Sequence, residues 1–532
     1  MIITMNSLYV LILLAGAFGL YYVLLKSKTS RSLPLPPGPK GLPIIGNIGN
    51  DLPPGGGKDW EHWLKHKELY GPISSVTTAG HTLIILNDVK VAIELLEKRS
   101  ARYSSRPRMV MASELAGADI FVTMKNDPTT VRGHRKRMHL QLGSEHALSS
   151  YYPQLDVEVR RFLLRTLQKP EKLIDHIHTA VAGIILKITY DYTVEPSGRD
   201  PLIRLVEKAA EGFGIINQPG AWLVDSIPAL KYLPSWLPVA GFKQQAREYR
   251  RRFDALADRP FAFVRHQMKE QHFEPSFVSK QIKQAGAQLS PEEEEEIKHS
   301  AAAAYMAGYD TTASTISSFF LAMALYRDAQ HKAQEEIDRV VGTRLPTPED
   351  RANLPYINAL FNEVLRWNPV VQIGIMHSAT KDDIYEGYSI PKGVPVVPNI
   401  WALTHDPDVY SDPMSFSPER FLDSDGHIPE RDPHTLAFGF GRRICPGRVL
   451  ADLNNFLMIS QSLAVFRIGK AVKDGKEIDP IVDYQPGIVG HLSAFEISIQ
   501  PRTAEYGALI HSVATEHPLS HGDSAVLENI TV

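Results

Sequence analysis

The only cysteine of the 532-residue chain, Cys445, lies in a short segment rich in glycine and arginine, FGFGRRICPG at residues 438–447. A single cysteine excludes an intramolecular disulfide and any zinc site built from cysteine pairs. A thiolate can still bind a metal ion on its own. Alternatively, a lone cysteine is a small buried hydrophobic residue, which is the commoner case. The neighbouring residues have to decide between these two interpretations.

The residues around this cysteine favour a metal-bound thiolate, of the kind that serves as axial ligand of a haem iron. Gly439 and Gly441 would let the backbone approach a flat ligand closely. Arg442 and Arg443 supply cations for a haem propionate and for the sulfur. Pro446 predicts the start of a helix that runs from Gly447 to about Val465. The sulfur would then lie at a positive helix end, which lowers a thiol pKa and keeps the sulfur ionised.

The segment resembles the haem-binding loop of the cytochrome P-450 family of haem-thiolate monooxygenases, whose pattern is Phe-x-x-Gly-x-Arg-x-Cys-x-Gly. Five positions are in register: Phe438, Gly441, Arg443, Cys445 and Gly447. The resemblance implies that Cys445 is the axial ligand of the iron of haem b and that the other four residues form its binding loop.

A second segment, AGYDTT at residues 307–312, lies in a predicted helix that begins at Ser290 with a capping box. The small residues before it, 301–308, would allow either a flat ligand or another helix to lie against this helix. The segment resembles the oxygen-activation motif of the same family. The resemblance implies that Asp310 and Thr311 relay protons during oxygen activation, with Gly308 loosening the helix locally.

Glu363 and Arg366 are spaced i, i+3, so they share one face of a predicted helix. On a surface such a pair is worth about 0.2–0.5 kcal/mol. The segment leading into them, 353–361, is too apolar to be mostly exposed. Together with Arg420, the pair resembles the family's Glu-x-x-Arg network. A buried network of this kind would lock the region of the cysteine loop, so its loss should reduce haem binding first.

The resemblance also implies cations for the haem propionates. The candidates are Arg443, Arg135, His377, which follows a predicted strand at 369–376, and Arg106. The family usually has tryptophan four residues before the position of Arg135, and here that residue is Val131. Valine cannot donate a hydrogen bond to a propionate.

The composition is that of an ordinary globular protein, with 43% hydrophobic residues, 22% charged residues and a net charge of −3. It contains no basic run that would indicate nucleic-acid binding. Residues 1–25 carry no charge, and the apolar run 8–25 would span about 27 Å as a helix. Lys26, Lys28 and Arg31 follow it, which predicts an uncleaved single-pass anchor in the endoplasmic reticulum with the rest of the chain in the cytosol. A cleaved signal peptide is the alternative.

The remaining pattern predicts a mainly α fold with small β-sheets, and the resemblance makes it the cytochrome P-450 fold. A helix is expected at 59–69, strands at 73–78 and 82–86, and long helices from 127 to about 342, interrupted at 222–241. After the anchor, residues 26–40 form a basic and proline-rich hinge, 41–502 the monooxygenase domain, and 503–532 a tail expected to be disordered.

The resemblance implies hydroxylation of a lipophilic small molecule with dioxygen and electrons from NADPH. A membrane-bound flavoprotein reductase would deliver the electrons, docking on a basic face that includes Arg442 and Arg448. The hinge and the segments 222–241 and 366–369 resemble fungal members that act in secondary metabolism. Those members act on terpenoid skeletons, polyketides or indole amines, and among these a terpenoid is favoured. The pocket should be lined by residues around 109–124, 213–241, 303–307, 370–375 and 488–492.

Two other functions are consistent with a haem-thiolate loop. One is an isomerase or dehydratase that needs no external electrons, but such members typically lack the pair formed here by Asp310 and Thr311. The other is a non-catalytic haem-binding protein, in which that pair would be idle. The sequence indicates neither the substrate, the position oxidised nor the number of oxidation steps.

Overall fold

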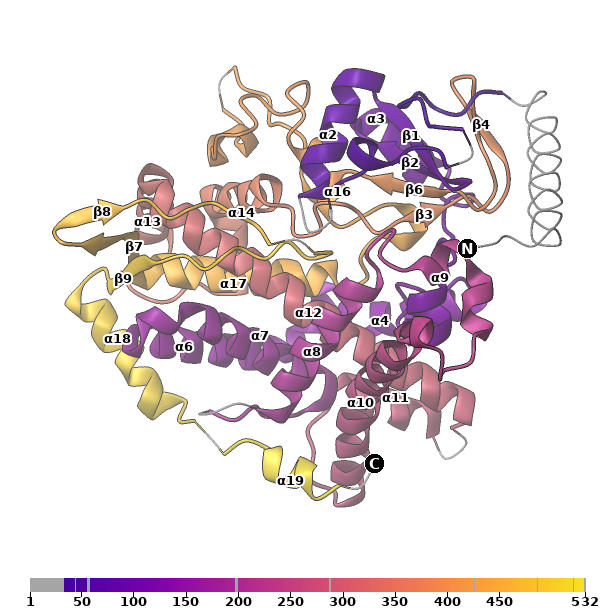
Figure 1. The fold of residues 1–532 in the computed structure, drawn as a ribbon. Coiled ribbons are helices and arrows are strands. Elements are labelled where there is room, and N and C mark those ends of the chain that lie inside the picture. The colour runs from indigo at the N-terminus through magenta and orange to yellow at the C-terminus, as the bar shows by residue number, and fades with distance from the viewer. Residues whose placement is uncertain are drawn as a thin grey trace, which may run out of the picture.

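The computed structural model describes residues 33–43, 45–54, 58–196, 200–286, 289–424, 426–485, 487–519 and 521–530. Helices dominate these residues and the strands form small sheets, as predicted (Figure 1). The helices are α2 (Asp59–Tyr70), α3 (Val89–Ala92), α4 (Pro128–Leu142), α5 (Glu145–Leu148), α6 (Tyr152–Gln168), α7 (Leu173–Tyr190), α8 (Pro201–Ile216), α9 (Leu223–Ser226), α10 (Phe242–Lys269), α11 (Phe277–Ala285), α12 (Pro291–Leu325), α13 (Arg327–Val340), α14 (Pro355–Trp367), α15 (Ile400–Thr404), α16 (His434–Ala437), α17 (Arg448–Val465), α18 (Ala504–Glu516) and α19 (Ser524–Glu528).

The largest sheet among the described residues has the strand order β1–β2–β6–β3. It joins the predicted hairpin of β1 (Ile73–Thr78) and β2 (His81–Leu86) to β3 (His377–Ser378) and β6 (Pro395–Pro398). The smaller sheets pair β4 (Asp383–Tyr385) with β5 (Tyr388–Ile390), and β7 (Phe466–Lys473) with β8 (Lys476–Ile478) and β9 (Ile497–Pro501). Ser378 also donates its amide to the carbonyl of Ser105, at 2.9 Å. That bond brings β3 next to the segment that carries Arg106.

Helix α12 crosses the middle of the molecule and forms its core (Figure 1). The predicted capping box is present, because Ser290 Oγ accepts from the amide of Glu293 and the Glu293 carboxylate accepts from the amide of Ser290, both at 3.2 Å. The helix packs against α4, α7, α8 and α17, and most of its side chains after residue 297 are buried. Any residue on its exposed stretches is therefore held by a rigid element.

The N-terminal anchor predicted at 1–25 and most of the hinge at 26–40 lie outside the described residues. Within the part of the chain that the structure describes, no helix is long and apolar enough to cross a membrane.

The C-terminal segment differs from its prediction. Residues 504–516 and 524–528 form α18 and α19 rather than a disordered tail. Thr503 caps α18 by accepting from the amide of Tyr506, and Ile510, Val513 and Leu527 are almost fully buried. In Figure 1 both helices, in yellow, lie along the outside of the helical part, and α18 packs on α6 and α19 on α10. Burial of these apolar side chains is what orders the segment.

The strand predicted at 369–376 is also absent. This apolar segment bonds to separate neighbours, because Gly374 donates to the carbonyl of Pro398 at 2.8 Å and Val370 accepts from the amide of Gly490 at 2.7 Å. Two bonds to two different segments do not make a ladder, so strand β3 begins only at His377.

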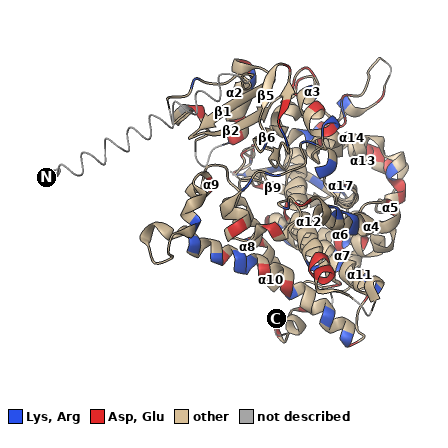
Figure 2. Ribbon diagram, turned by 90° about the vertical axis from the view of Figure 1, so that its right-hand side faces the viewer, with Lys and Arg blue, Asp and Glu red and all other residues tan. Residues whose placement is uncertain are grey.

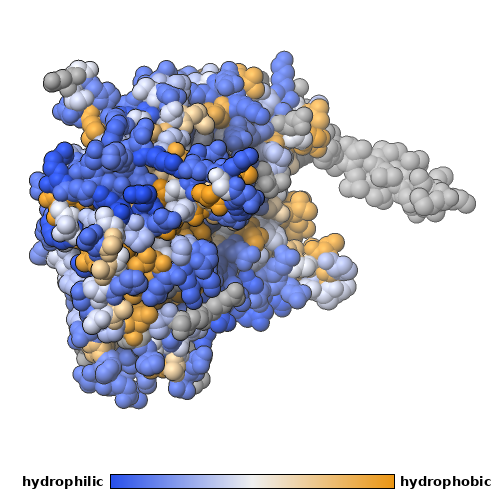
Figure 3. All heavy atoms as spheres, turned by 90° about the vertical axis from the view of Figure 1, so that its left-hand side faces the viewer, coloured by the Kyte–Doolittle hydropathy of each residue, from blue (hydrophilic) through white to orange (hydrophobic). Residues whose placement is uncertain are grey.

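Charged residues of both signs cover much of the outside. Lys and Arg lie along α10 in particular (Figure 2). The buried face of this helix carries Phe253, Leu256 and Phe263. The side of the molecule with the β7–β8 hairpin and α18 is largely hydrophilic, with scattered apolar side chains (Figure 3). These faces are ordinary solvated surfaces.

Candidate active site

Cys445 lies just before α17, whose first residue is Arg448 and whose N-cap is Gly447. The helix therefore starts one residue later than predicted and ends at Val465 as expected. The amide of Cys445 donates to the carbonyl of Phe438 at 2.8 Å, which closes the loop between those two residues. Cys445 itself is half-buried.

The surroundings of Cys445 do not lower the pKa of its thiol, as the sequence predicted they would. Burial raises its pKa, and this effect outweighs the amide of Gly447 and the charges of Arg135 and Arg448, which lower it. The helix end and the arginines therefore do not lower the pKa of the thiol on their own, because the cost of a buried charge is larger. A coordinating metal ion deprotonates a thiol outright.

Gly441 has a reason within the protein itself, beside the approach to a flat ligand that the sequence predicts. Its φ is +52°, and a Cβ there would lie 2.4 Å from Cβ of Ser100 and 2.5 Å from the carbonyl oxygen of Leu96. Its amide also donates to the carboxylate of Glu97. Gly441 thus lets the cysteine loop touch the helical turn at 93–98. A Cβ at Gly447 would meet no protein atom within 4 Å.

The four predicted propionate cations form one cluster, which consists of Arg106, Arg135, Arg443 and His377. They lie close enough together for the charge of one to affect the pKa of another. Arg443 donates to the carbonyl oxygens of Ser104, Val122 and Lys125. Arg106 donates to the carbonyl oxygens of Thr123, Ile375 and Met376. The carbonyl oxygen of Tyr103 lies 2.7 Å from Nδ1 of His377. Backbone carbonyls thus orient three of the four side chains.

This cationic cluster has no acidic partner: among the described residues no carboxylate makes an ion pair with Arg106, Arg135 or Arg443. Burial and the charges of Arg443 and Arg135 lower the pKa of Arg106 to about 9. Burial and Arg135 lower the pKa of Arg443 to about 10, and burial and Arg106 lower that of His377 to about 3. Buried cations that repel one another are stabilised by an anion bound between them.

Val131 lies one helical turn before Arg135, on α4, and its side chain is buried. The helix begins as predicted, at Pro128 after Asp127, whose carboxylate accepts from the amide of Thr130 at 2.7 Å. The position of the usual tryptophan is therefore an apolar core position in this chain. Any anion bound by the cationic cluster must do without a donor from it.

In the middle of α12, Ala304, Ala307 and Thr311 are partly or fully exposed although most of the helix is buried. Their spacing places them on one helix face. Thr311 Oγ1 donates to the carbonyl of Ala307 at 2.6 Å, and the helix is continuous through Gly308. The predicted loosening at Gly308 is thus wrong. A Cβ there would lie 3.0 Å from Cδ1 of Ile185, so this glycine serves the close packing of α7.

Asp310 is mostly buried, with 17% of its side chain exposed, and makes an ion pair with His491. The distance from Nε2 of His491 to Oδ1 of Asp310 is 3.1 Å. Burial lowers the pKa of His491, but the hydrogen bond and charge of Asp310 outweigh it, so the pKa lies above its usual value. The sequence did not reveal this partner, because His491 lies in a loop far along the chain with no motif around it.

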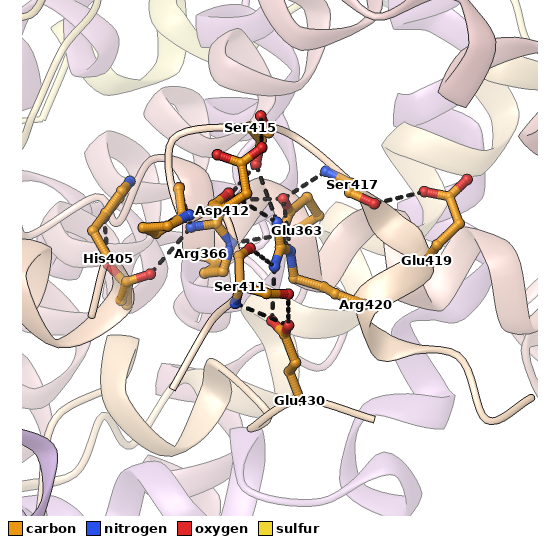
Figure 4. A network of polar contacts seen from close by, with 12 residues as sticks. Glu363, Arg366, His405, Ser411, Asp412, Ser415, Ser417, Glu419, Arg420 and Glu430 are labelled. Carbon is orange, nitrogen blue, oxygen red and sulfur yellow. Dashed lines mark hydrogen bonds and ion pairs between the residues drawn. The ribbon is translucent and has the colours of Figure 1, made fainter. Parts of the chain in front are cut away.

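The predicted network of Glu363, Arg366 and Arg420 is assembled and buried (Figure 4). The carboxylate of Glu363 accepts from Nε and Nη2 of Arg366, at 2.7 and 2.9 Å, from Nε of Arg420 at 3.2 Å and from the amide of Ser417 at 2.7 Å. Arg366 also donates to the carbonyls of Thr404, Pro413 and Ser415, and Arg420 to that of Ser411 and to the carboxylate of Glu430. The network ties α14 to the segment 404–430 that leads into the cysteine loop.

His434 is a second residue that sequence reasoning missed. Its ring stacks on that of Phe438, with centroids 5.4 Å apart. Its Nδ1 lies 2.8 Å from Asp432 and its Nε2 3.0 Å from Asp452, and Asp452 also accepts from Arg351. Burial lowers the pKa of His434, but the two aspartates raise it to about 9. The neighbouring Asp432 was the only signal of this arrangement in the sequence.

These residues fit haem. Cys445 is a sulfur donor at a loop closed by its own backbone. The cationic cluster, which has no acidic partner in the part of the chain that the structure describes, matches the two carboxylates that haem carries. Gly447 leaves its Cβ position free of protein atoms. The exposed face of α12 adds a hydroxyl next to an acid that is paired with histidine.

Comparison with known proteins agrees with this arrangement. Residues 36–488 match the family described as Cytochrome P450. The chain is 48% identical over 501 residues to the cytochrome P450 monooxygenase ppsD of Aspergillus oryzae, covering 94% of each chain. It is 45% identical over 504 residues to claR, a cytochrome P450 monooxygenase of Ampulloclitocybe clavipes, covering 94% of this chain and 92% of claR. It is 40% identical over 521 residues to the O-methylsterigmatocystin oxidoreductase of Aspergillus flavus, covering 97% of each chain.

Proposed function

The chain belongs to the cytochrome P450 family and is a monooxygenase of that family, and on this premise we propose that it hydroxylates a lipophilic small molecule of fungal secondary metabolism. Dioxygen supplies the oxygen atom and NADPH the electrons. The observation that carries the proposal is the cationic cluster near the only cysteine, which has buried and half-buried members and no acidic partner among the described residues.

The residues of the loop and the cluster would hold the cofactor. Cys445 would ligate the iron, and Arg443, Arg135, Arg106 and His377 would hold the propionates. Haem, when bound, supplies the binding of dioxygen and the oxidising chemistry. Carbonyl bonds fix Arg106 and Arg443 in place, so they would bind without reorganising.

Asp310 and Thr311 would deliver protons during oxygen activation. Thr311 lies on the exposed face of α12, and its hydroxyl is oriented by the bond to Ala307. Asp310 lies on the same helix, one residue before Thr311, and most of its side chain is buried. An acid and a hydroxyl positioned on adjacent residues are the kinds of group that general acid catalysis uses.

The substrate is proposed to be apolar and bound mainly by shape. The segments expected to line the pocket contribute buried apolar residues such as Met109, Val110, Met111 and Phe121. A terpenoid skeleton is the first substrate to test, on the resemblance of the hinge and of segments 222–241 and 366–369 to fungal members. O-methylsterigmatocystin, named in one relative, is the second.

Electrons would come from a membrane-bound NADPH-dependent flavoprotein reductase. Arg442 and Arg448, both exposed next to the cysteine loop, would form part of its docking face. The N-terminal segment 1–25 would anchor the protein in the endoplasmic reticulum with the domain in the cytosol.

The first experiment is a carbon-monoxide difference spectrum of the reduced, membrane-expressed protein, with Cys445→Ser beside it. A strongly red-shifted Soret band that the substitution abolishes is expected. Turnover with NADPH and a reductase would then be screened against the terpenoids and O-methylsterigmatocystin. Haem bound without the shifted band would overturn thiolate ligation, and product formed without reductase would favour an isomerase or dehydratase.

A further inference from the structure

The ion pair between Asp310 and His491 is held from both sides by the fold. Asp310 is part of the rigid α12, and one turn later Ser314 Oγ donates to the carbonyl of Gly490 at 2.7 Å. Gly490 donates its amide to Val370 at 2.7 Å. The backbone next to His491 is therefore fixed against α12 and against the segment after α14, and the imidazole is positioned before any reaction begins.

The two partners differ in their access to water. The side chain of His491 is 36% exposed and that of Asp310 17%. Thr311, adjacent to Asp310, lies on the exposed face of α12. His491 is thus the more accessible partner of the pair, and Asp310 links it along α12 to Thr311.

We propose that His491 passes protons from water to Asp310 and is thereby the positioning residue of the relay formed by Asp310 and Thr311. This inference rests on the proposed function. The proton on Nε2 of His491 moves to Oδ1 of Asp310, which leaves a neutral imidazole and a neutral carboxylic acid. His491 then regains a proton from water, and no electrons are transferred.

The other ionisable groups near the pair do not offer the same route. His178, on α7, feels the charges of Asp310 and His491, but burial holds its pKa below the usual value and among the described residues it has no hydrogen bond to Asp310. Asp175 of α7 and Glu207 of α8 act on Tyr309, and Tyr309 donates to Glu207 at 3.1 Å. Within the described residues, His491 is the only ion-pair partner of Asp310.

The raised pKa of His491 agrees with its position next to the carboxylate of Asp310. Because Asp310 raises the pKa of His491, the ion pair is fully present below the ordinary histidine pKa and is lost as the pH rises through the raised value. Proton transfer through His491 should therefore decline over the same pH range.

The test uses the full-length, haem-loaded enzyme with reductase, NADPH and dioxygen, and compares His491→Phe, His491→Gln and Asp310→Asn. His491→Phe is expected to slow NADPH oxidation about tenfold or more, since positioned proton transfer contributes about 10²–10⁴-fold and water restores part of it. His491→Gln keeps an amide donor for Asp310 but cannot titrate. It should lose the alkaline limb of the wild-type pH profile.

Hydrogen exchange of the peptide 483–493 provides a readout that does not depend on turnover. At pH 6 this peptide should exchange more slowly in the wild type than in Asp310→Asn, and the difference should vanish above the pKa of His491. The matched control is His331→Gln, an exposed histidine that pairs with Glu335 at 3.2 Å on α13 and should change neither readout.

The outcomes separate this inference from the proposed function. A His491→Gln enzyme with the wild-type rate and pH profile would overturn the role of His491, as would equal exchange in the wild type and Asp310→Asn at pH 6. If Asp310→Asn also oxidised NADPH at the wild-type rate, the relay itself would fall, and with it that part of the proposed function.

Discussion

Burial decides the ionisation of most groups near Cys445. It raises the pKa of the cysteine thiol and lowers those of Arg106, Arg443 and His377. His434 is the exception, because two aspartates outweigh its burial and raise its pKa to about 9. With this raised pKa, the His434 ring that stacks on Phe438 carries a positive charge until the pH approaches about 9.

The charge on His434 should stabilise the protein in a pH-dependent way. A group whose pKa is raised on folding contributes fully below its unfolded pKa and loses the contribution as the pH rises through the folded value. The window here runs from about 6.5 to about 9. We expect His434→Gln to lower the free energy of unfolding by about 2 kcal/mol at pH 6.5 and by almost nothing above pH 9. Unfolding midpoints of both proteins across that range measure the difference.

The control for His434→Gln is again His331→Gln. His331 is exposed, and it pairs with only one carboxylate among the described residues, that of Glu335, at 3.2 Å. It should leave the midpoint unchanged at every pH. A His434→Gln protein whose deficit stayed constant from pH 6.5 to pH 9.5 would show that the ring contributes by packing alone.

At this scale the sequence located Cys445 through a motif with fixed spacing, and the resemblance pointed to the four cations that the structure brings together. It could not predict how Cys445 ionises, since desolvation depends on what packs around the sulfur. Nor could it predict the partners of His434 and His491. Asp452 and Asp310 come from helices far away in the chain, and only folding brings them within hydrogen-bond distance.

At the scale of elements, the network of Glu363, Arg366 and Arg420 joins α14 to the segment that precedes the cysteine loop. Its charges are completely removed from water, and Glu363 balances two guanidinium groups. Removing one partner of such a network leaves a buried charge without compensation, which costs far more than the network is worth as a whole.

We expect Glu363→Gln to lower the free energy of unfolding by about 3–5 kcal/mol and to reduce haem content before it affects turnover per haem. The measurements are the unfolding midpoint and the ratio of haem to protein after purification. Glu335→Gln makes the same chemical change at an exposed pair on α13, where ion pairs are worth about 0–1 kcal/mol. If Glu363→Gln and Glu335→Gln had the same unfolding midpoint, the buried network would not stabilise the region of the cysteine loop.

Helices and strands followed their predicted positions best where a local signal set their ends. Asp127 and Pro128 start α4, and Ser290 starts α12, through caps that residue type and spacing identify. The segment 369–376 failed because apolar, β-branched residues fit a strand or a buried loop equally well. Hydrogen bonds to the carbonyl of Pro398 and from the amide of Gly490 hold this segment as a loop.

At the scale of the whole molecule, the C-terminal helices α18 and α19 extend the domain beyond the boundary predicted at residue 502. Tyr506, Ile510 and Val513 are spaced i, i+4 and i+7, the pattern of a buried helix face, and that signal was present in the sequence. Arg161 of α6 reaches the carbonyls of His517 and Pro518, at 3.4 and 2.8 Å, and so clamps the segment between the two helices. The segment is thus part of the fold around α6.

If α18 helps to hold α6, removing one of its buried side chains should weaken the whole domain rather than the C-terminus alone. Ile510 is 1% exposed, and Ile510→Ala is expected to cost about 2–4 kcal/mol in the free energy of unfolding because it leaves a cavity against α6. Leu519→Ala removes a side chain of the same volume that is 47% exposed, so it should cost less than about 0.5 kcal/mol. Loss of haem absorbance and of helical circular dichroism at one common midpoint would show cooperative unfolding. An Ile510→Ala protein that loses only a little helical signal early, and keeps the wild-type haem midpoint, would mean that α18 merely rests on the domain.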